Sequence, residues 1–140
     1  MIRIETMFRA LADPTRLRLL NLLRGGDLCV SDIMQILQVP QAKVSRHLIY
    51  LRQAGLVDCR RQGLWIFYRL SSPRTAFHRT LLESLEQCFV GVPGIDADSR
   101  RAMRLREEGG CCPEISGNGT RSEERRTQSG VERRSSCARI

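Results

Sequence analysis

The chain has 140 residues, of which 41% are hydrophobic, and a formal net charge of +8. This length supports one hydrophobic core, and the positive charge, which lies mainly in residues 1–88 with thirteen basic against seven acidic side chains, favours a polyanionic partner. The N-terminal segment MIRIETMFRALAD carries charges throughout and has no long apolar run, which excludes a signal peptide and a membrane span there, so we expect a cytoplasmic protein.

Two helices are predicted at the start of the chain. The apolar stripe within residues 7–12 indicates a short first helix. Asp13 as N-cap and Pro14 at the first helical position begin a second helix, which ends at Gly25 and Gly26. Its leucines cover most of the helix circumference, which predicts a helix in the middle of the core: Leu17, Leu19, Leu20, Leu22 and Leu23.

Residues 30–57 are typical of a helix-turn-helix that binds DNA. The first helix is predicted over about Ser31 to Leu37, with Ser31 and Asp32 capping its exposed amides. Pro40 prevents continuation, and the second helix starts at Gln41. An ordinary amphipathic helix pair with a solvated basic face is the alternative interpretation.

The second helix places apolar residues on one side and short polar or basic residues on the other near its N-terminus. A helix in the major groove needs hydrogen-bonding side chains in its first turns, and Gln41, Ser45 and Arg46 are of this type. We add Lys43 as a candidate DNA contact because of its charge. These side chains are therefore the candidate DNA-binding face.

A hairpin is predicted directly after this helix. Val57 to Arg61 and the segment LWIFYRL alternate as strands, and Gly63 permits the turn. Arg60, Arg61 and Gln62 fall at the tip, so the hairpin can act as a wing that contacts phosphates or the minor groove. For each of these residues a solvated turn is the alternative.

A further helix beginning at Ser72 and Pro73 is predicted to mediate dimerisation. Its apolar stripe is assigned to a second subunit: Phe77, Leu81, Leu85, Cys88 and Phe89. A dimer also suits a two-fold operator, whose half-sites lie about 34–36 Å apart. The expected fold is mainly helical with a two-stranded wing (α+β), that is, a dimeric winged helix-turn-helix.

The rest of the chain divides by composition. We expect a winged-helix and dimerisation domain over residues 1–90, a C-terminal extension over 91–112 that includes a short basic helix from about Asp98 to Glu108, and a disordered tail over 113–140. The extension ends with Cys111 and Cys112, which follow two glycines and have no core to fill. Six cysteines in a cytoplasmic protein are expected to be reduced thiols.

Four motifs in order resemble the ArsR/SmtB family of metal- and metalloid-responsive repressors: ALADPTRLRLLNLL, DLCVSDI, VPQAKVSRHLIYLRQAGLV and RRQGLWIFYRL. The resemblance covers about the first 88 residues. It implies a winged-helix homodimer that occupies double-stranded operator DNA and leaves it when an inducer binds. It also implies DNA contacts at Gln41, Ala42, Ser45 and Arg46, whereas Lys43, Arg60 and Arg61 come from charge alone.

The resemblance to the family does not extend to its familiar inducer site. The arsenic-binding motif C-V-C-D-L-C corresponds here to residues 29–34, and of its three cysteines only Cys29 is retained. A zinc site on the last helix would need paired histidines and acids, whereas the chain offers only His78 near Glu83 there, so no zinc site is expected. Cys29 and Cys59 are expected to be core residues.

The pair Cys111 and Cys112 resembles the relocated sites of some arsenic-responsive members. Trivalent arsenic and antimony are thiophilic and bind two or three thiolates. Arsenite would require a third sulfur, from Cys88 or Cys137, in the same or another subunit, whereas methylarsenite needs only the pair. Cys88 is as well suited to packing in the dimer stripe as to ligation. Cys137 is interpreted as incidental if it is not the third ligand.

The leading hypothesis is therefore a homodimeric repressor that arsenite, methylarsenite or antimonite releases from DNA, without an organic cofactor or a membrane partner. The alternative is a thiol-based redox sensor with the same DNA-binding fold. An enzyme is not expected, because no cysteine has a neighbouring histidine and acid in a plausible arrangement and no Gly-rich phosphate loop is present.

Overall fold

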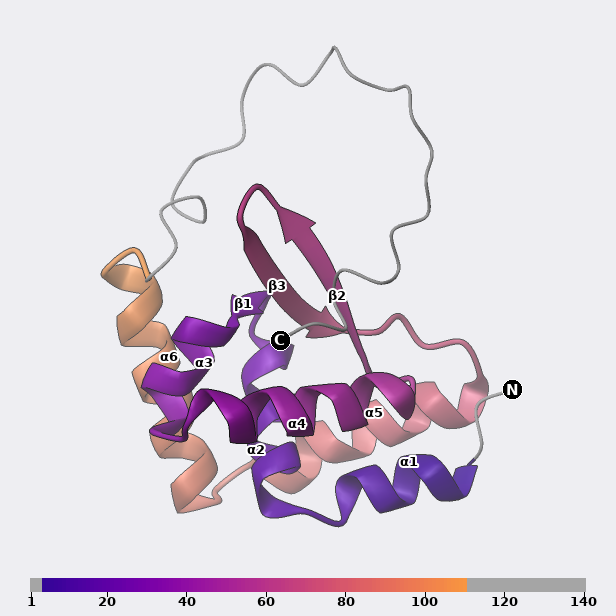
Figure 1. Cartoon of the computed structure of the whole chain (residues 1–140). Helices are drawn as coiled ribbons and strands as arrows, with labels where there is room; N and C mark the ends of the chain where they lie inside the picture. Colours follow the sequence, from indigo (N-terminus) through magenta and orange to yellow (C-terminus); the bar gives the residue numbers. More distant parts are fainter. Residues whose placement is uncertain (1–3, 111–140) are drawn as a thin grey trace, which may run out of the picture.

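The computed structural model describes residues 4–110 and has a winged helix-turn-helix fold, as predicted (Figure 1). The elements follow the order α1 (Ile4–Leu11), α2 (Pro14–Arg24), β1 (Leu28–Cys29), α3 (Val30–Leu37), α4 (Gln41–Gln53), β2 (Val57–Gln62), β3 (Trp65–Leu70), α5 (Ala76–Phe89) and α6 (Pro93–Glu107). The hairpin of β2 and β3 projects from a helical body, and α4 crosses the front of that body in Figure 1. None of the helices in the described range is long and apolar enough to cross a membrane.

Helix α2 forms the centre of the core, as its leucines predict. Asp13 caps it, because the Asp13 carboxylate accepts a hydrogen bond of 3.0 Å from the backbone amide of Arg16, and Pro14 occupies the first turn. Four of its five leucines are at most 3% exposed: Leu19, Leu20, Leu22 and Leu23. Helices α1, α3, α4 and α6 all contact α2.

Helix α3 begins differently from the prediction. Its N-cap is Cys29, which makes no side-chain cap hydrogen bond, and Ser31 and Asp32 lie within the first turn, not at the cap. The reason is strand β1, which pairs with β3 and fixes the chain up to Cys29, so that the helix begins at Val30. Asp32 is 1% exposed, and its carboxylate still lies in the first turn, where the helix dipole favours a negative charge.

The wing contains one strand more than predicted. The sheet order is β1-β3-β2, with Leu28 opposite Tyr68 and Cys29 opposite Phe67. A two-residue strand is too short to show an alternating pattern, so no periodicity indicated it. The predicted turn is confirmed, because Gly63 has φ +59° between the two long strands.

The apolar stripe of α5 packs partly on its own chain, which corrects its assignment to a second subunit alone. Phe77, Leu81 and Leu85 are half-buried against the main core, and the rings of Phe8 and Phe77 lie 5.7 Å apart. Ile4 and Phe8 of α1 are more than half exposed. The apolar surface that remains for a second subunit is therefore shared by α1 and α5.

Helix α6 begins at Pro93, five residues earlier than the predicted basic helix, and packs against α2 and α3. Ala102 and Leu105 belong to the main core. Most of the predicted extension over residues 91–112 is thus continuous with the folded body, while the predicted tail over residues 113–140 lies outside the described residues.

Candidate nucleic-acid interface

The N-terminal half of α4 presents the predicted DNA-binding face. Four residues of this half are exposed: Gln41, Ala42, Lys43 and Arg46. A shallow hollow on the same face is lined by Gln41, Ala42, Ser45, Arg46 and Ile49. The hollow therefore combines amide, hydroxyl and guanidinium groups, which can hydrogen-bond to base edges and phosphates.

Ser45 lies deeper than the other predicted contacts. It is 5% exposed, and its hydroxyl has no hydrogen-bond partner among the described residues. The position follows from the helix period, because Ser45 is next to buried Val44 and one turn before buried Leu48. Ser45 therefore lies on the flank of the DNA-binding face, at the buried margin of the hollow.

Helix α4 is held against α2 by contacts that the sequence did not indicate. The guanidinium of Arg16 lies 4.2 Å from the centroid of the Tyr50 ring, and His47 Nδ1 lies 3.8 Å from the Asp13 carboxylate. Burial lowers the pKa of His47 below its ordinary value, although the negative charge of Asp13 opposes this shift. These contacts add to the packing of buried Val44, Leu48 and Leu51, which sets the direction of the exposed face of α4.

The turn before α4 depends on an unusual backbone conformation. Gln38 has φ +55°, in the left-handed region, and its amide donates a hydrogen bond of 2.8 Å to the carbonyl of Met34. Pro40 then occupies the N-cap of α4. The turn thereby sets the angle between α3 and α4.

The two wing arginines differ in their environment. Arg60 donates to the Asp27 carboxylate at 2.7 Å and to Gln62 at 2.7 Å, and its guanidinium lies 4.9 Å from the centroid of the Phe67 ring. Arg61 is exposed and donates to the carbonyl of Gly63, close to the tip. The guanidinium of Arg60 is thus engaged within the protein, and Arg61 is the better placed of the two for a phosphate contact.

The cysteines of the described range lie apart in the fold, and Cys29 and Cys88 among them carry free thiols. Cys29 is buried beside Phe67 and Trp65, Cys59 packs partly against the main core, and Cys88 is exposed near the end of α5. Within the described ranges no three His, Cys, Asp or Glu residues are grouped so as to hold a metal ion. Cys111, Cys112 and Cys137 lie outside the described residues.

The position of Cys88 bears on the third sulfur ligand. Cys88 precedes the first residue of α6, whereas Gly110 follows its last turn, and the fifteen residues of this helix span about 22 Å. Cys88 of the same chain therefore lies at the opposite end of α6 from Gly110, the residue that precedes Cys111 in the sequence.

His78 is buried in α5, whereas Glu83 on the same helix is exposed, so these residues do not face each other. The imidazole is 0% exposed, and neither ring nitrogen has a hydrogen-bond partner in the described part of the chain. Burial lowers the pKa of His78, an effect that Arg74 reinforces and Asp58 opposes. His78 is therefore a neutral core residue near pH 7.

This burial predicts a pH dependence of stability. Below about pH 6.5 the unfolded chain binds a proton at His78 that the folded chain does not, so the free energy of unfolding falls with decreasing pH by at most about 1.4 kcal/mol per pH unit from this group. Urea denaturation between pH 5 and 8 should show a shallower fall for His78→Leu than for the wild type. His47 contributes to the pH dependence with the same sign in both proteins. The difference between the two slopes therefore reports the contribution of His78. Equal slopes would contradict a buried neutral imidazole.

Comparison with known proteins gives consistent results. The family model described as "Bacterial regulatory protein, arsR family" matches residues 13–58. The chain is 39% identical over 108 residues to the arsenic resistance transcriptional regulator ArsR1 of Pseudomonas putida, covering 74% of this chain and 77% of that protein. It is 42% identical over 83 residues to the arsenical resistance operon repressor of Escherichia coli, covering 59% of this chain and 71% of the repressor.

Solved structures share the fold. Reduced HlyU from Vibrio cholerae superposes with a TM-score of 0.54 and 30% identity, covering 61% of this chain and 87% of HlyU. The homodimeric winged helix-turn-helix DNA-binding domain of Mb0332 from Mycobacterium bovis superposes with a TM-score of 0.53 and 26% identity, covering 62% of this chain and 75% of that domain.

Proposed function

This chain belongs to the arsR family of bacterial regulatory proteins, and on that premise we propose that it is a repressor which trivalent arsenic releases from operator DNA. The family consists of transcription regulators, so the chain is a regulator and not an enzyme. The observation that carries the proposal is the exposed face of α4, where Gln41 and Arg46 border a hollow on a winged-helix frame.

The proposed assembly is a homodimer that binds double-stranded DNA. The similar Mb0332 domain is described as homodimeric, and α1 exposes Ile4 and Phe8 beside the half-buried stripe of α5. Burial of this surface in a two-fold interface would place two α4 helices on successive half-sites of an operator. The same symmetry would present two wings, each with an exposed Arg61.

Two observations support a thiophilic inducer. Two regulators that the chain resembles are named for arsenic resistance, and Cys111 and Cys112 stand next to Gly110, the last described residue. Trivalent arsenic forms strong bonds to adjacent thiolates. Tighter binding to a dimer whose α4 helices no longer match the half-site spacing would release the operator, and by linkage DNA would weaken arsenical binding by the same factor.

The inducer class follows from the number of available sulfurs. Methylarsenite already carries one carbon substituent, so Cys111 and Cys112 complete its coordination. Arsenite or antimonite would require a third thiolate, and Cys88 of the same chain lies at the other end of α6. The third ligand would therefore be Cys137 or a thiol of a second subunit, and we propose methylarsenite as the inducer that one chain can bind alone.

Replacement of both cysteines tests this function. Cys111→Ser/Cys112→Ser should bind operator DNA like the wild type, because neither residue belongs to α4 or the wing, but methylarsenite should no longer release it. Fluorescence anisotropy on the chain's own upstream DNA measures both properties, with Cys88→Ser as the matched control that keeps its response. A double variant that methylarsenite still releases would exclude this pair as the site.

A redox sensor is the second candidate, because the chain is similar to HlyU, whose structure was solved in a reduced form. In that case oxidation by peroxide would convert two thiols to a disulfide, with two electrons and two protons passing to the peroxide and water as the product. Release by peroxide and not by methylarsenite in the same anisotropy assay would favour this candidate.

A further inference from the structure

Helix α6 is anchored to α2 by a partly buried ion pair. Arg18 Nε donates to Asp98 Oδ2 at 2.7 Å, and Arg18 Nη2 donates to Asp98 Oδ1 at 2.9 Å, so the contact is bidentate. The Asp98 side chain is only 1% exposed. Because a bidentate pair in such a place has one good geometry, it fixes the position of α6 along α2.

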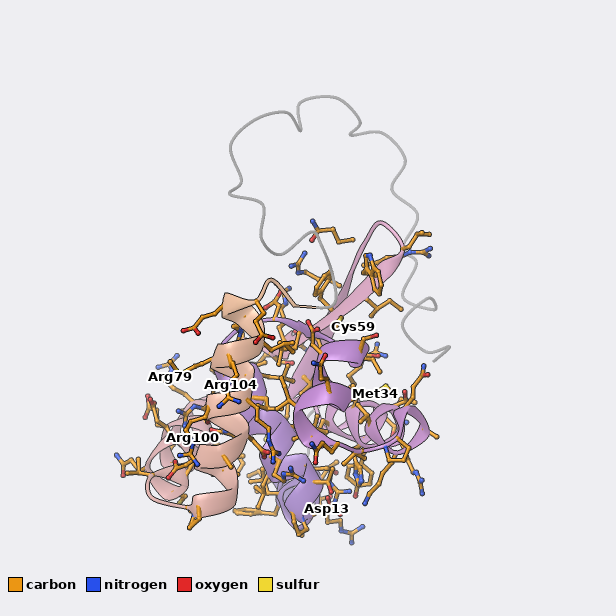
Figure 2. All side chains as sticks on the ribbon, turned by 90° about the vertical axis from the view of Figure 1, so that its left-hand side faces the viewer. Asp13, Met34, Cys59, Arg79, Arg100 and Arg104 are labelled. Atoms are coloured by element: carbon orange, nitrogen blue, oxygen red, sulfur yellow. The ribbon has the colours of Figure 1, made fainter. Side chains whose placement is uncertain are left out.

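A second group of contacts joins α6 to α3. Arg101 Nη1 lies 3.7 Å from Asp98 Oδ1 and donates to the carbonyl of Ile36, in the last turn of α3, at 3.3 Å. Leu105 packs in the main core beside Ile36 and other residues of α3. Helix α6 therefore contacts both α2 and α3, and Figure 2 shows Arg100 and Arg104 pointing outward from the same helix.

The C-terminal end of α6 contacts the start of α3. Gly110 has φ +68°, its amide donates to the carbonyl of Leu105 at 2.9 Å, and a Cβ added to it would lie 3.3 Å from the Asp32 carboxylate. The residue bonded to Cys111 is thus packed against the first turn of α3. A displacement of Gly110 would therefore act on the junction between α6 and α3.

The other end of the connection is the DNA-binding helix. Helix α2, which holds Asp98 through Arg18, also holds α4 through the contacts of Arg16 with Tyr50 and of Asp13 with His47. Helix α2 therefore lies between α6 and α4 and contacts both. A shift of α6 along α2 would consequently change the support of the recognition helix.

We propose that α6 transmits inducer binding to the recognition helix, and that Arg18, Asp98 and Arg101 are the positioning residues of this transmission. The inference rests on the proposed function, because the signal is the arsenical at Cys111 and Cys112. Packed elements move between discrete arrangements and do not deform continuously, so a firmly docked α6 passes a shift at residue 110 to α2 and α3. When the contacts of Arg18, Asp98 and Arg101 are weakened, the arsenical still binds, but α6 moves without displacing α2 and α3.

The test compares variants of the full-length dimer. Asp98→Asn removes one charge of the partly buried pair, and Arg101→Ala removes an exposed side chain that a stable fold tolerates. Arg100→Ala is the matched control, since it removes the same charge from the adjacent exposed position of α6. For each protein we measure the operator Kd without arsenical, and the methylarsenite Kd with and without operator DNA.

The wild type and Arg100→Ala should bind methylarsenite about tenfold or more tightly in the absence of DNA than on it, which is an ordinary allosteric coupling. For Asp98→Asn and Arg101→Ala this ratio should fall below about threefold, while the operator Kd and the methylarsenite Kd of the free protein stay within about twofold of the wild type. An unchanged operator Kd shows that the winged helix of a variant is folded. If Asp98→Asn does not fold, the result for Arg101→Ala alone tests the transmission through α6.

The outcomes separate the two proposals. Suppose that methylarsenite releases the wild type from DNA and that both variants keep the wild-type ratio of methylarsenite Kd values with and without DNA. The transmission through α6 is then overturned, while the proposed function stands. If the wild type binds methylarsenite and remains on DNA with no change in affinity, the proposed function fails, and the transmission that rests on it fails too.

Discussion

Replacing Leu48 with alanine is expected to lower the free energy of unfolding by about 2–5 kcal/mol. Leu48 is 0% exposed and lies in the core cluster that joins α4 to α2 and α3. Its loss removes buried apolar surface and leaves a cavity that rigid neighbouring helices fill only in part. Urea denaturation followed by circular dichroism measures the change.

A matched control is available on the wing. Leu64 is 90% exposed at the hairpin turn, so Leu64→Ala should change the free energy of unfolding by less than about 0.5 kcal/mol. Equal effects of the two substitutions would contradict the burial of the inner face of α4. Because α4 is attached to the body through this face, Leu48→Ala should also weaken operator binding at temperatures near its lowered unfolding midpoint.

The elements that were predicted correctly carry strong local signals. Asp13 and Pro14 mark the start of α2 through capping chemistry, and Pro40 marks the start of α4. The hairpin was visible because β3 has branched and aromatic residues and Gly63 provides the turn. Each of these features depends on residues close in sequence, which is why the winged helix could be predicted from sequence alone.

The features that were missed depend on contacts between distant residues. Strand β1 exists because Leu28 pairs with Tyr68, forty residues later, and Arg60 is engaged by Asp27, which lies just before β1. Likewise, the docking of α6 depends on Arg18 and Asp98, which are eighty residues apart. No periodicity within one element reports such pairs, so the candidate DNA contacts could be predicted but the frame that orients them could not.

Arg46→Ala is expected to weaken operator binding by about 1–3 kcal/mol, or roughly 5- to 150-fold. Arg46 is exposed in the second turn of α4 and borders the hollow with Gln41 and Ser45, so its guanidinium can reach a guanine edge or a phosphate. Anisotropy titrations at several salt concentrations measure the affinity and its salt dependence. A base contact predicts relaxed specificity at one position, whereas a phosphate contact predicts a salt slope lower by about one.

The control for this substitution is Arg79→Ala. Arg79 is exposed on α5, and Figure 2 shows it on the opposite side of the molecule from Met34 of α3. Both substitutions remove one positive charge, so a loss that came only from net charge would be the same for the two proteins. If Arg79→Ala weakened binding as much as Arg46→Ala, or if neither did, α4 would not be the DNA-binding helix. A selective loss at Arg46 would place the operator against the face of α4 that Arg16 and Asp13 hold in position.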